Sequence, residues 1–316
     1  MRRFLIGRLL GAIVTLFVTT LLVFFLVRLA PGDPIASMFG TQYNAKVAAS
    51  LRHFYGLDKP IYQQYANWMS SIAHGNLGYS ILTQEPASAL VRERIPRTLY
   101  LMAGGILAGL LIALPAGTLA ARFRARWPDY FLVSITTALL AIPQFFLGMV
   151  LVIIFSVRLR WLPPPGYIDP SVDFVGSLKS MVLPWLTIGF VSAALIARVL
   201  RSSMLDVLGQ DYIRTARSRG VAEPTVLRHH ALRNAAIPTV TIIGLEVGYL
   251  LGGSIVVERV FGYPGMGDLI VSSVTQRDYP LIQASVLFFA VAFVLVNLLT
   301  DLVYVALDPK VRARPA

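Results

Sequence analysis

The chain has 316 residues, of which 56% are hydrophobic and only 14% are charged, whereas an ordinary soluble domain carries about 25% charged residues. This composition excludes an ordinary soluble enzyme and favours a protein whose solvent is the lipid bilayer. The formal net charge is +12 and there is no cysteine, so disulfides, thiolate metal sites and cysteine nucleophiles are excluded.

The first predicted element is a membrane-spanning helix within residues 1–30. Its apolar run, Leu9 to Val27, follows the basic residues Arg2, Arg3 and Arg8, an order that a signal peptide would share. The run of 19 residues is longer than the apolar part of a signal peptide, which has about 7–15 residues. We therefore expect a retained anchor.

The rest of the chain predicts an all-α, polytopic membrane protein. Residues 31–97 are expected to form an extracytoplasmic cap, for which a loosely ordered loop is the alternative. A core of five further spans is expected in residues 98–307, followed by a cytoplasmic tail of residues 308–316. Each predicted span is apolar and long enough to cross the hydrocarbon core of a bilayer; the five are residues 98–121, 130–157, 181–200, 235–257 and 280–307.

The distribution of lysine and arginine predicts the orientation of the six spans. With the N-terminus in the cytoplasm, the cytoplasmic segments hold 16 of these residues and the short external segments hold 5. The long external segment carries little weight, because the positive-inside rule acts through short loops. We therefore expect both termini in the cytoplasm. Topology accounts for the excess positive charge, so no nucleic-acid partner is expected.

Common motifs of nucleotide or metal chemistry are missing from the sequence. All four histidines fall outside the predicted spans. The segment most similar to a phosphate-binding loop, residues 262–267, is followed by Asp268, where such a loop needs a lysine. We expect a non-catalytic subunit with no cofactor or metal of its own, so ATP and magnesium would have to be bound by partner subunits.

Candidate residues for a solute path lie inside two spans. Glu246 is near the middle of the span 235–257, where an acid costs roughly 2.5–3.5 kcal/mol on insertion scales. It is a candidate for lining a translocation path, and a hydrogen bond to a neighbouring helix is the alternative. Pro143, Phe145 and Phe146 are candidates for a gate, and packing against lipid is the alternative for them.

The longest predicted cytoplasmic loop, residues 206–234, is expected to form a helical hairpin. Tyr212, Ala216 and Gly220 recur every four residues, which places them on one stripe of a helix where another surface can approach closely. Gly220 is suited to end the first helix, and Pro224 to begin a second short helix that runs towards Arg233. The stripe is flanked by Arg214, Arg217 and Arg219, and an amphipathic loop on anionic lipid is the alternative.

Several segments of this chain resemble those of one transporter family. Residues 211–220, followed by residues 230–238, are similar to the cytoplasmic EAA signature of ABC importer permeases in the dipeptide, oligopeptide and nickel branch. Further segments resemble that branch in the same order along the chain: residues 28–34, 75–80, 142–145, 261–267, 277–280 and 308–312. A single match is weak, but their order and the expected topology together make the resemblance specific.

The resemblance implies a type I ABC importer permease, most similar to the B-type subunit of dipeptide systems, in the cytoplasmic (inner) membrane of a prokaryote. It implies as partners a second homologous permease, two cytoplasmic ATPases, an extracytoplasmic solute-binding protein and membrane lipid. By the same resemblance, Tyr212, Ala216 and Gly220 would contact an ATPase, with Arg217 and Arg219 at the rim. Ala216 and Gly220 would be the closest contacts and Tyr212 the anchoring aromatic residue.

Two residues depart from the family pattern, and the solute is left open. Asp211 supplies the acid of the signature one residue before Tyr212, and Glu246 stands where a neutral or amide residue is expected. Di- or oligopeptides are the expected solutes, with a nickel- or haem-type importer as the alternative. A secondary transporter is a further alternative, but we find no convincing internal repeat of the kind such transporters carry.

Overall fold

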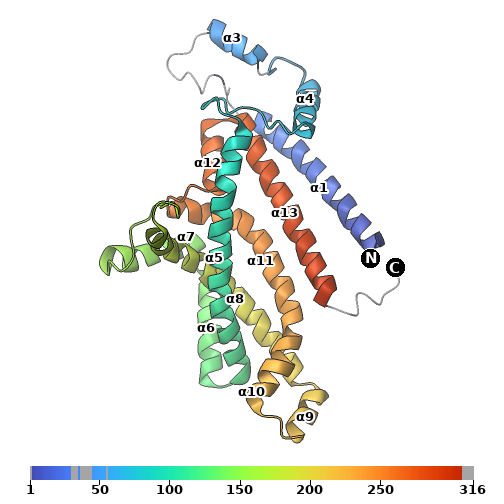
Figure 1. Cartoon of the computed structure of the whole chain (residues 1–316), viewed down its shortest axis with the longest axis vertical. Coiled ribbons are helices and arrows are strands. Elements are labelled where there is room, and N and C mark those ends of the chain that lie inside the picture. Colours follow the sequence, from blue (N-terminus) through green and yellow to red (C-terminus); the bar gives the residue numbers. More distant parts are fainter. Residues whose placement is uncertain (1, 30–34, 36–44, 55, 308–316) are drawn as a thin grey trace. The chain divides into compact units, whose positions relative to one another are not determined.

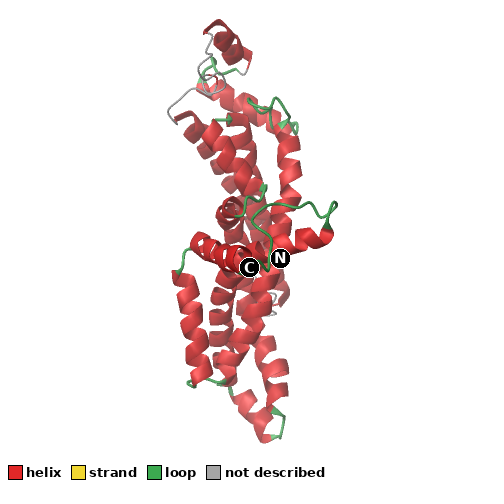
Figure 2. Ribbon diagram, turned by 90° about the vertical axis from the view of Figure 1, so that its left-hand side faces the viewer, coloured by secondary structure: helices red, strands yellow, loops and turns green. Residues whose placement is uncertain are grey.

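The computed structural model describes residues 2–29, 35, 45–54 and 56–307. Helices dominate this part of the chain, and loops of differing length join them (Figure 2). The described residues form no strand, so the predicted all-α class is confirmed. Two of the segments quoted above, residues 30–34 and 308–312, lie outside the described residues.

The helices follow one another along the chain with few long interruptions (Figure 1). Two of them, η2 and η3, are π-helical segments that continue an α-helix. The order is α1 (Arg2–Leu29), α3 (Ala45–Phe54), α4 (Ile61–Ala73), α5 (Ala87–Arg122), α6 (Trp127–Ala141), α7 (Gln144–Leu151), η2 (Val152–Arg158), α8 (Phe174–Leu208), α9 (Asp211–Ser218), α10 (Glu223–Thr225), η3 (Val226–Leu232), α11 (Arg233–Val260), α12 (Met266–Gln276) and α13 (Tyr279–Leu307).

The helices group into two compact units, each built from separate stretches of chain. One unit comprises the described parts of residues 2–98 together with residues 264–294. The other comprises residues 99–263 and the described residues from 295 onward. The segment predicted as a cap therefore shares a unit with α12 and the first part of α13.

In the described part of the chain, five helical segments are long and apolar enough to cross a membrane, and a bent helix pair supplies a sixth candidate. The predicted third span, residues 130–157, is broken into two helical pieces: α6 and the continuous α7–η2 segment meet at an angle of 105°. Pro143 causes the break, because proline has no amide hydrogen and disfavours a helical conformation in the residue before it. Ile142 is accordingly extended, with ψ at 126°.

In the unit formed by residues 99–263 and 295 onward, α8 is the central helix. It packs against α6, α7 and α11, and α5 runs alongside it (Figure 1). At the crossing of α5 and α8, a Cβ atom built on Gly189 would lie 2.9 Å from the Cβ atom of Ala108. Only a glycine allows the two backbones to approach this closely, as is common between membrane helices.

In the other unit, the helix α4 packs on the end of α1. The ring of Phe24 lies 5.1 Å from the ring of Tyr65 and 5.7 Å from that of Trp68. Aromatic pairs at such distances contribute packing energy beyond the area they bury. A second cluster joins the start of α5 to α12 and α13 through Val91, Met266 and neighbouring buried residues.

Candidate functional site

The predicted hairpin has a sharply defined turn after α9. Gly220 adopts a left-handed conformation with φ at +80°, which favours glycine. The amide of Val221 donates to the carbonyl of Ala216, and the amide of Gly220 donates to the carbonyl of Arg217. These two bonds form a Schellman motif that terminates the helix, so the prediction that Gly220 ends the first helix is confirmed.

The stripe of Tyr212, Ala216 and Gly220 lies on an accessible side of α9. Tyr212 is 46% exposed, Gly220 is exposed and Ala216 is partly buried. A Cβ atom built on Gly220 would meet no atom within 4 Å. The neighbouring Ile213 is fully buried and anchors the helix from the other side. The geometry thus leaves room for another surface to approach the stripe.

Two contacts close the hairpin across its turn. Nε and Nη2 of Arg217 donate to the carboxylate of Glu223 at 3.1 and 2.7 Å, and these hydrogen bonds raise the pKa of the Arg217 guanidinium above its ordinary value. Nδ2 of Asn234 donates to the hydroxyl of Tyr212 at 3.0 Å. Arg217 therefore stabilises the turn itself, whereas Arg219 has no hydrogen bond or ion pair within the described chain.

The second arm of the hairpin differs from the prediction of a separate short helix. Pro224 does lie in the first turn of α10, as predicted. From there α10, η3 and α11 run on as one helical segment, Glu223–Val260. Because no glycine or proline lies between Pro224 and Pro238, nothing in the backbone ends the helix at Arg233. The turn at Gly220 is therefore followed, from Glu223 onward, by unbroken helix to the end of α11.

The hairpin also packs on the ends of two other helices. Met204 of α8, Leu227 and Ala231 of η3 and Ala121 of α5 belong to one buried cluster. Their side chains are nearly or fully excluded from solvent. Because close-packed interiors have low compressibility, the cluster holds η3 firmly against α5 and α8.

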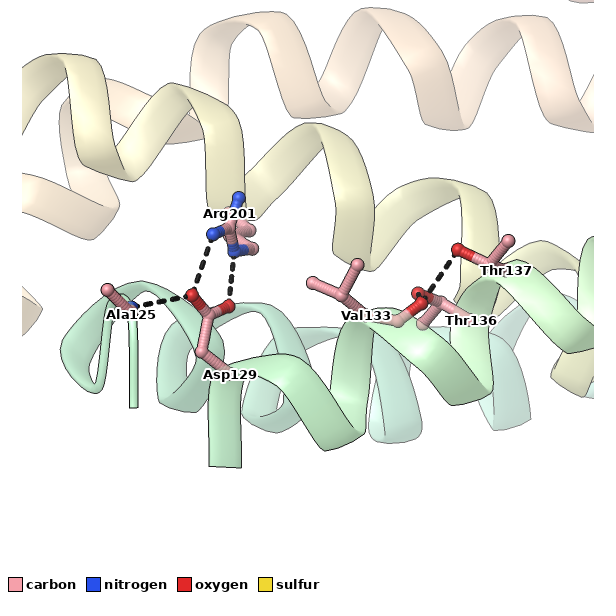
Figure 3. A network of polar contacts seen from close by, with 6 residues as sticks. All are labelled: Ala125, Asp129, Val133, Thr136, Thr137 and Arg201. Carbon is pink, nitrogen blue, oxygen red and sulfur yellow. Dashed lines mark hydrogen bonds and ion pairs between the residues drawn. The ribbon is translucent and has the colours of Figure 1, made fainter. Parts of the chain in front are cut away.

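An ion pair fastens α6 to α8 close to this cluster (Figure 3). The guanidinium of Arg201 donates to both carboxylate oxygens of Asp129, at 2.6 and 2.8 Å, and the backbone amide of Ala125 donates to the same carboxylate at 2.9 Å. Asp129 is only 2% exposed. Sequence reasoning missed this pair, although an acid directly before a predicted span, as Asp129 is before residues 130–157, is a signal that it needs a partner.

Glu246 is buried between two helices of the same unit. It is 7% exposed, and the hydroxyl of Ser192 on α8 donates to its Oε1 at 2.8 Å. The sequence left two interpretations of Glu246 open. The hydrogen bond to a neighbouring helix, which is one of them, is present in the structure. Whether Glu246 also lines a solute path stays a prediction.

The three gate candidates lie at the break between α6 and α7. Pro143 precedes the first residue of α7, and the side chains of Phe145 and Phe146 are both exposed. Gly148, one turn further on, lies close to Phe261 at the end of α11. The exposed rings fit both contact with lipid and contact with another subunit, so a gate here stays a prediction. No cluster of three or more potential metal ligands occurs in the described part of the chain.

The chain combines several apolar helices with an accessible hairpin that packs against them. This architecture is typical of a transport permease. Its sequence matches the family described as binding-protein-dependent transport system inner membrane component over residues 113–313, and the N-terminal component of the same system over residues 1–102. The chain belongs to this family: it is a permease subunit of an ABC importer, and it has no catalytic role of its own.

Similar proteins support the same assignment over nearly the full length. The glutathione transport system permease protein GsiC of Escherichia coli K12 is 43% identical over 312 residues, covering 99% of each chain. The protein of the same name from Shigella dysenteriae serotype 1 has the same identity and coverage.

Two solved structures share the fold. One is an amino acid ABC transporter with histidines, with a TM-score of 0.53, 16% identity, and coverage of 69% of this chain and 94% of that one. The other is the inward-facing methionine ABC transporter MetNI, with a TM-score of 0.55, 19% identity, and coverage of 70% and 97%.

Proposed function

We propose that this permease carries short peptides across the cytoplasmic membrane of a prokaryote and forms half of the translocation pathway. The hairpin receives the motion of an ATPase through Tyr212, Ala216 and Gly220. The observation that carries the proposal is the accessible turn at Gly220. The helical arm that follows this turn packs against α5 and α8 and continues without a break into α11.

The proposal includes a second permease, two cytoplasmic ATPases that bind ATP and magnesium, and an external solute-binding protein. The cap region is the proposed docking surface for the binding protein. A peptide solute is supported by the 43% identity to permeases named for glutathione transport, since glutathione is itself a tripeptide. ATP binding would bias two packings of the helices that differ by a few kcal/mol.

Reconstitution of the assembled transporter in liposomes tests this function. ATP hydrolysis is measured with an unloaded binding protein and with one loaded with a dipeptide or glutathione. The proposal expects that loading stimulates hydrolysis and that stimulation requires the permease and the ATPases together. Uphill uptake by the permease alone, or no effect of any peptide-loaded binding protein, would contradict it.

A further inference from the structure

A cavity of about 570 Å³ lies within the unit that contains the cap helix α4. Its wall is made by the end of α1, by α4, by the loop around residues 76–84 and by the start of α13. The volume lies within the range of small-molecule sites, about 300–1,000 Å³. Among the described residues that form the wall, one is basic, Arg28, and none is acidic.

Arg28 is partly buried and holds its guanidinium in a fixed position. Its Nε donates to Oε1 of Gln64 at 3.0 Å, and its Nη1 donates to the carbonyl of Phe24 at 3.3 Å. The centre of the guanidinium lies 3.5 Å from the centroid of the Phe24 ring. Since an arginine has five N–H donors, three remain without a hydrogen-bond partner among the described residues, and no carboxylate there pairs with the charge.

A second polar side chain of the wall also lacks a partner. Gln283 of α13 is only 4% exposed, and its Nε2 makes no hydrogen bond. A buried donor without a partner costs about 1–3 kcal/mol, so proteins rarely keep one without a reason. Gln283 therefore adds a second unpaired donor beside the cavity, with its Nε2 covered by neighbouring atoms in this structure.

Asp278 is adjacent in sequence to the cavity residue Tyr279, but its carboxylate is engaged elsewhere. It is 2% exposed and accepts hydrogen bonds from the hydroxyl of Ser80 and the backbone amide of Ile81. Its lone pairs are therefore used by the loop and are not offered to Arg28. Among the described residues, no carboxylate pairs with the positive charge of Arg28 in this cavity, so an incoming anion can do so.

We propose that this cavity binds the carboxylate of a small organic acid up to the size of a short peptide. The free donors of Arg28 take the carboxylate, because a guanidinium matches its planar geometry and such charge-assisted bonds are strong. Trp68 and Tyr79, which also form part of the wall, offer apolar surface to the rest of the ligand. Binding requires neither an ATPase nor a binding protein, so its outcome is independent of the proposed transport function.

Calorimetric titration of the purified full chain in nanodiscs of zwitterionic lipid tests the inference. The probes are trialanine, which has a free carboxylate, and trialanine amide, which does not. The free acid is expected to bind at least ten-fold more tightly than the amide. Arg28→Gln is expected to weaken binding of the free acid at least ten-fold, because it removes the charge and the paired donors.

Two further variants keep the test decisive if Arg28→Gln does not fold. Asn67→Asp places a negative charge on an exposed residue of the wall without changing its size, and it is expected to weaken binding of the free acid. The control is Arg92→Gln, which removes an exposed arginine of the same unit that does not line the cavity, and it is expected to leave binding unchanged. Equal binding of acid and amide, no binding of either, or free-acid binding unaffected by Asn67→Asp would overturn the proposal.

Discussion

Ser80 and Asp278 are 198 positions apart in the chain, yet the hydroxyl of Ser80 donates a hydrogen bond to the carboxylate of Asp278. The other oxygen of that carboxylate accepts from the backbone amides of Ile81 and Leu281, at 3.2 and 3.4 Å. Asp278 thus caps the start of α13 and holds the loop before α5 at the same time. This one side chain joins residues 75–80 to residues 277–280, two of the segments that resemble the permease family.

Replacing Asp278 with alanine is expected to loosen this junction. The change removes a helix cap and leaves buried donors without an acceptor, which together destabilise the protein by about 2–3 kcal/mol. Thermal unfolding of the purified protein in detergent measures the loss. Ser80→Ala removes only one of the donors and is expected to have a clearly smaller effect; equal effects of the two variants would contradict the role of Asp278 as the shared acceptor.

The pair of Arg201 and Asp129 is expected to fix α6 on α8. Arg201→Met leaves the carboxylate of Asp129 buried without its charge partner, so it should destabilise the protein by about 3 kcal/mol, the low end for a broken buried pair, because Arg201 is itself partly exposed. Unfolding by a denaturing detergent gives the magnitude. Arg198→Gln, one turn away on the same helix, is the control: its exposed side chain makes a single hydrogen bond to Thr137, and its effect should be slight.

A double variant separates the ion pair from the general effect of mutating Arg201. Asp129→Leu combined with Arg201→Met removes both charges, and replacing a buried ion pair by apolar residues is often close to neutral. The double variant is therefore expected to be more stable than Arg201→Met alone. If the double variant is the less stable of the two, Asp129 is not held by the charge of Arg201.

Glu246 is expected to act mainly through its bond to Ser192. Glu246→Gln keeps an acceptor for the Ser192 hydroxyl, whereas Glu246→Leu does not; a hydrogen bond between membrane helices contributes about 0.6 kcal/mol on average. We therefore expect Glu246→Gln to retain stability and peptide uptake, and Glu246→Leu to be less stable. A large change in the KM of uptake by Glu246→Gln, with stability unchanged, would instead favour a position in the solute path.

A bulky residue at Gly220 is expected to uncouple ATP hydrolysis from the permease. Gly220→Trp fills the accessible turn and also demands a left-handed conformation that disfavours side chains. Membrane insertion and subunit assembly should persist, while stimulation of ATP hydrolysis by the loaded binding protein should be lost.

Two controls separate bulk from backbone strain at this turn. Gly220→Asn is small and tolerates the left-handed conformation, so it should retain most of the stimulation. Gly209→Trp introduces the same bulk at an exposed glycine with φ at −80°, outside the stripe, and should also retain it. If the loaded binding protein stimulates ATP hydrolysis normally in Gly220→Trp, the turn at Gly220 does not contact the ATPase.

The membrane spans and the turn at Gly220 could be predicted because their signals are local. Long apolar runs mark the spans, and a glycine after a short amphipathic helix marks the turn. The local signal at Pro143 predicts a kink, but the angle between α6 and α7 depends on what each helix packs against. The continuous second arm was missed because Pro224 starts a helix and no local signal shows where that helix ends.

The contacts between distant residues could not be predicted from the sequence. Asp129 and Arg201 lie at opposite ends of two predicted spans, and only the side-by-side packing of α6 and α8 brings them together. The same holds for Ser192 and Glu246, where the sequence offered a helix contact without naming the partner. Polar pairs of this kind depend on the rotation of each helix about its axis, which hydropathy alone does not fix.

Crosslinking from Ala216 is the most direct test that an ATPase acts on this hairpin. The chain has no cysteine, so Ala216→Cys provides a single thiol for a short photoactivatable crosslinker. In the reconstituted transporter, we predict that the ATPase subunit is the main crosslinked product and that its yield changes when ATP is added. Crosslinks to lipid alone, with or without ATP, would contradict the account.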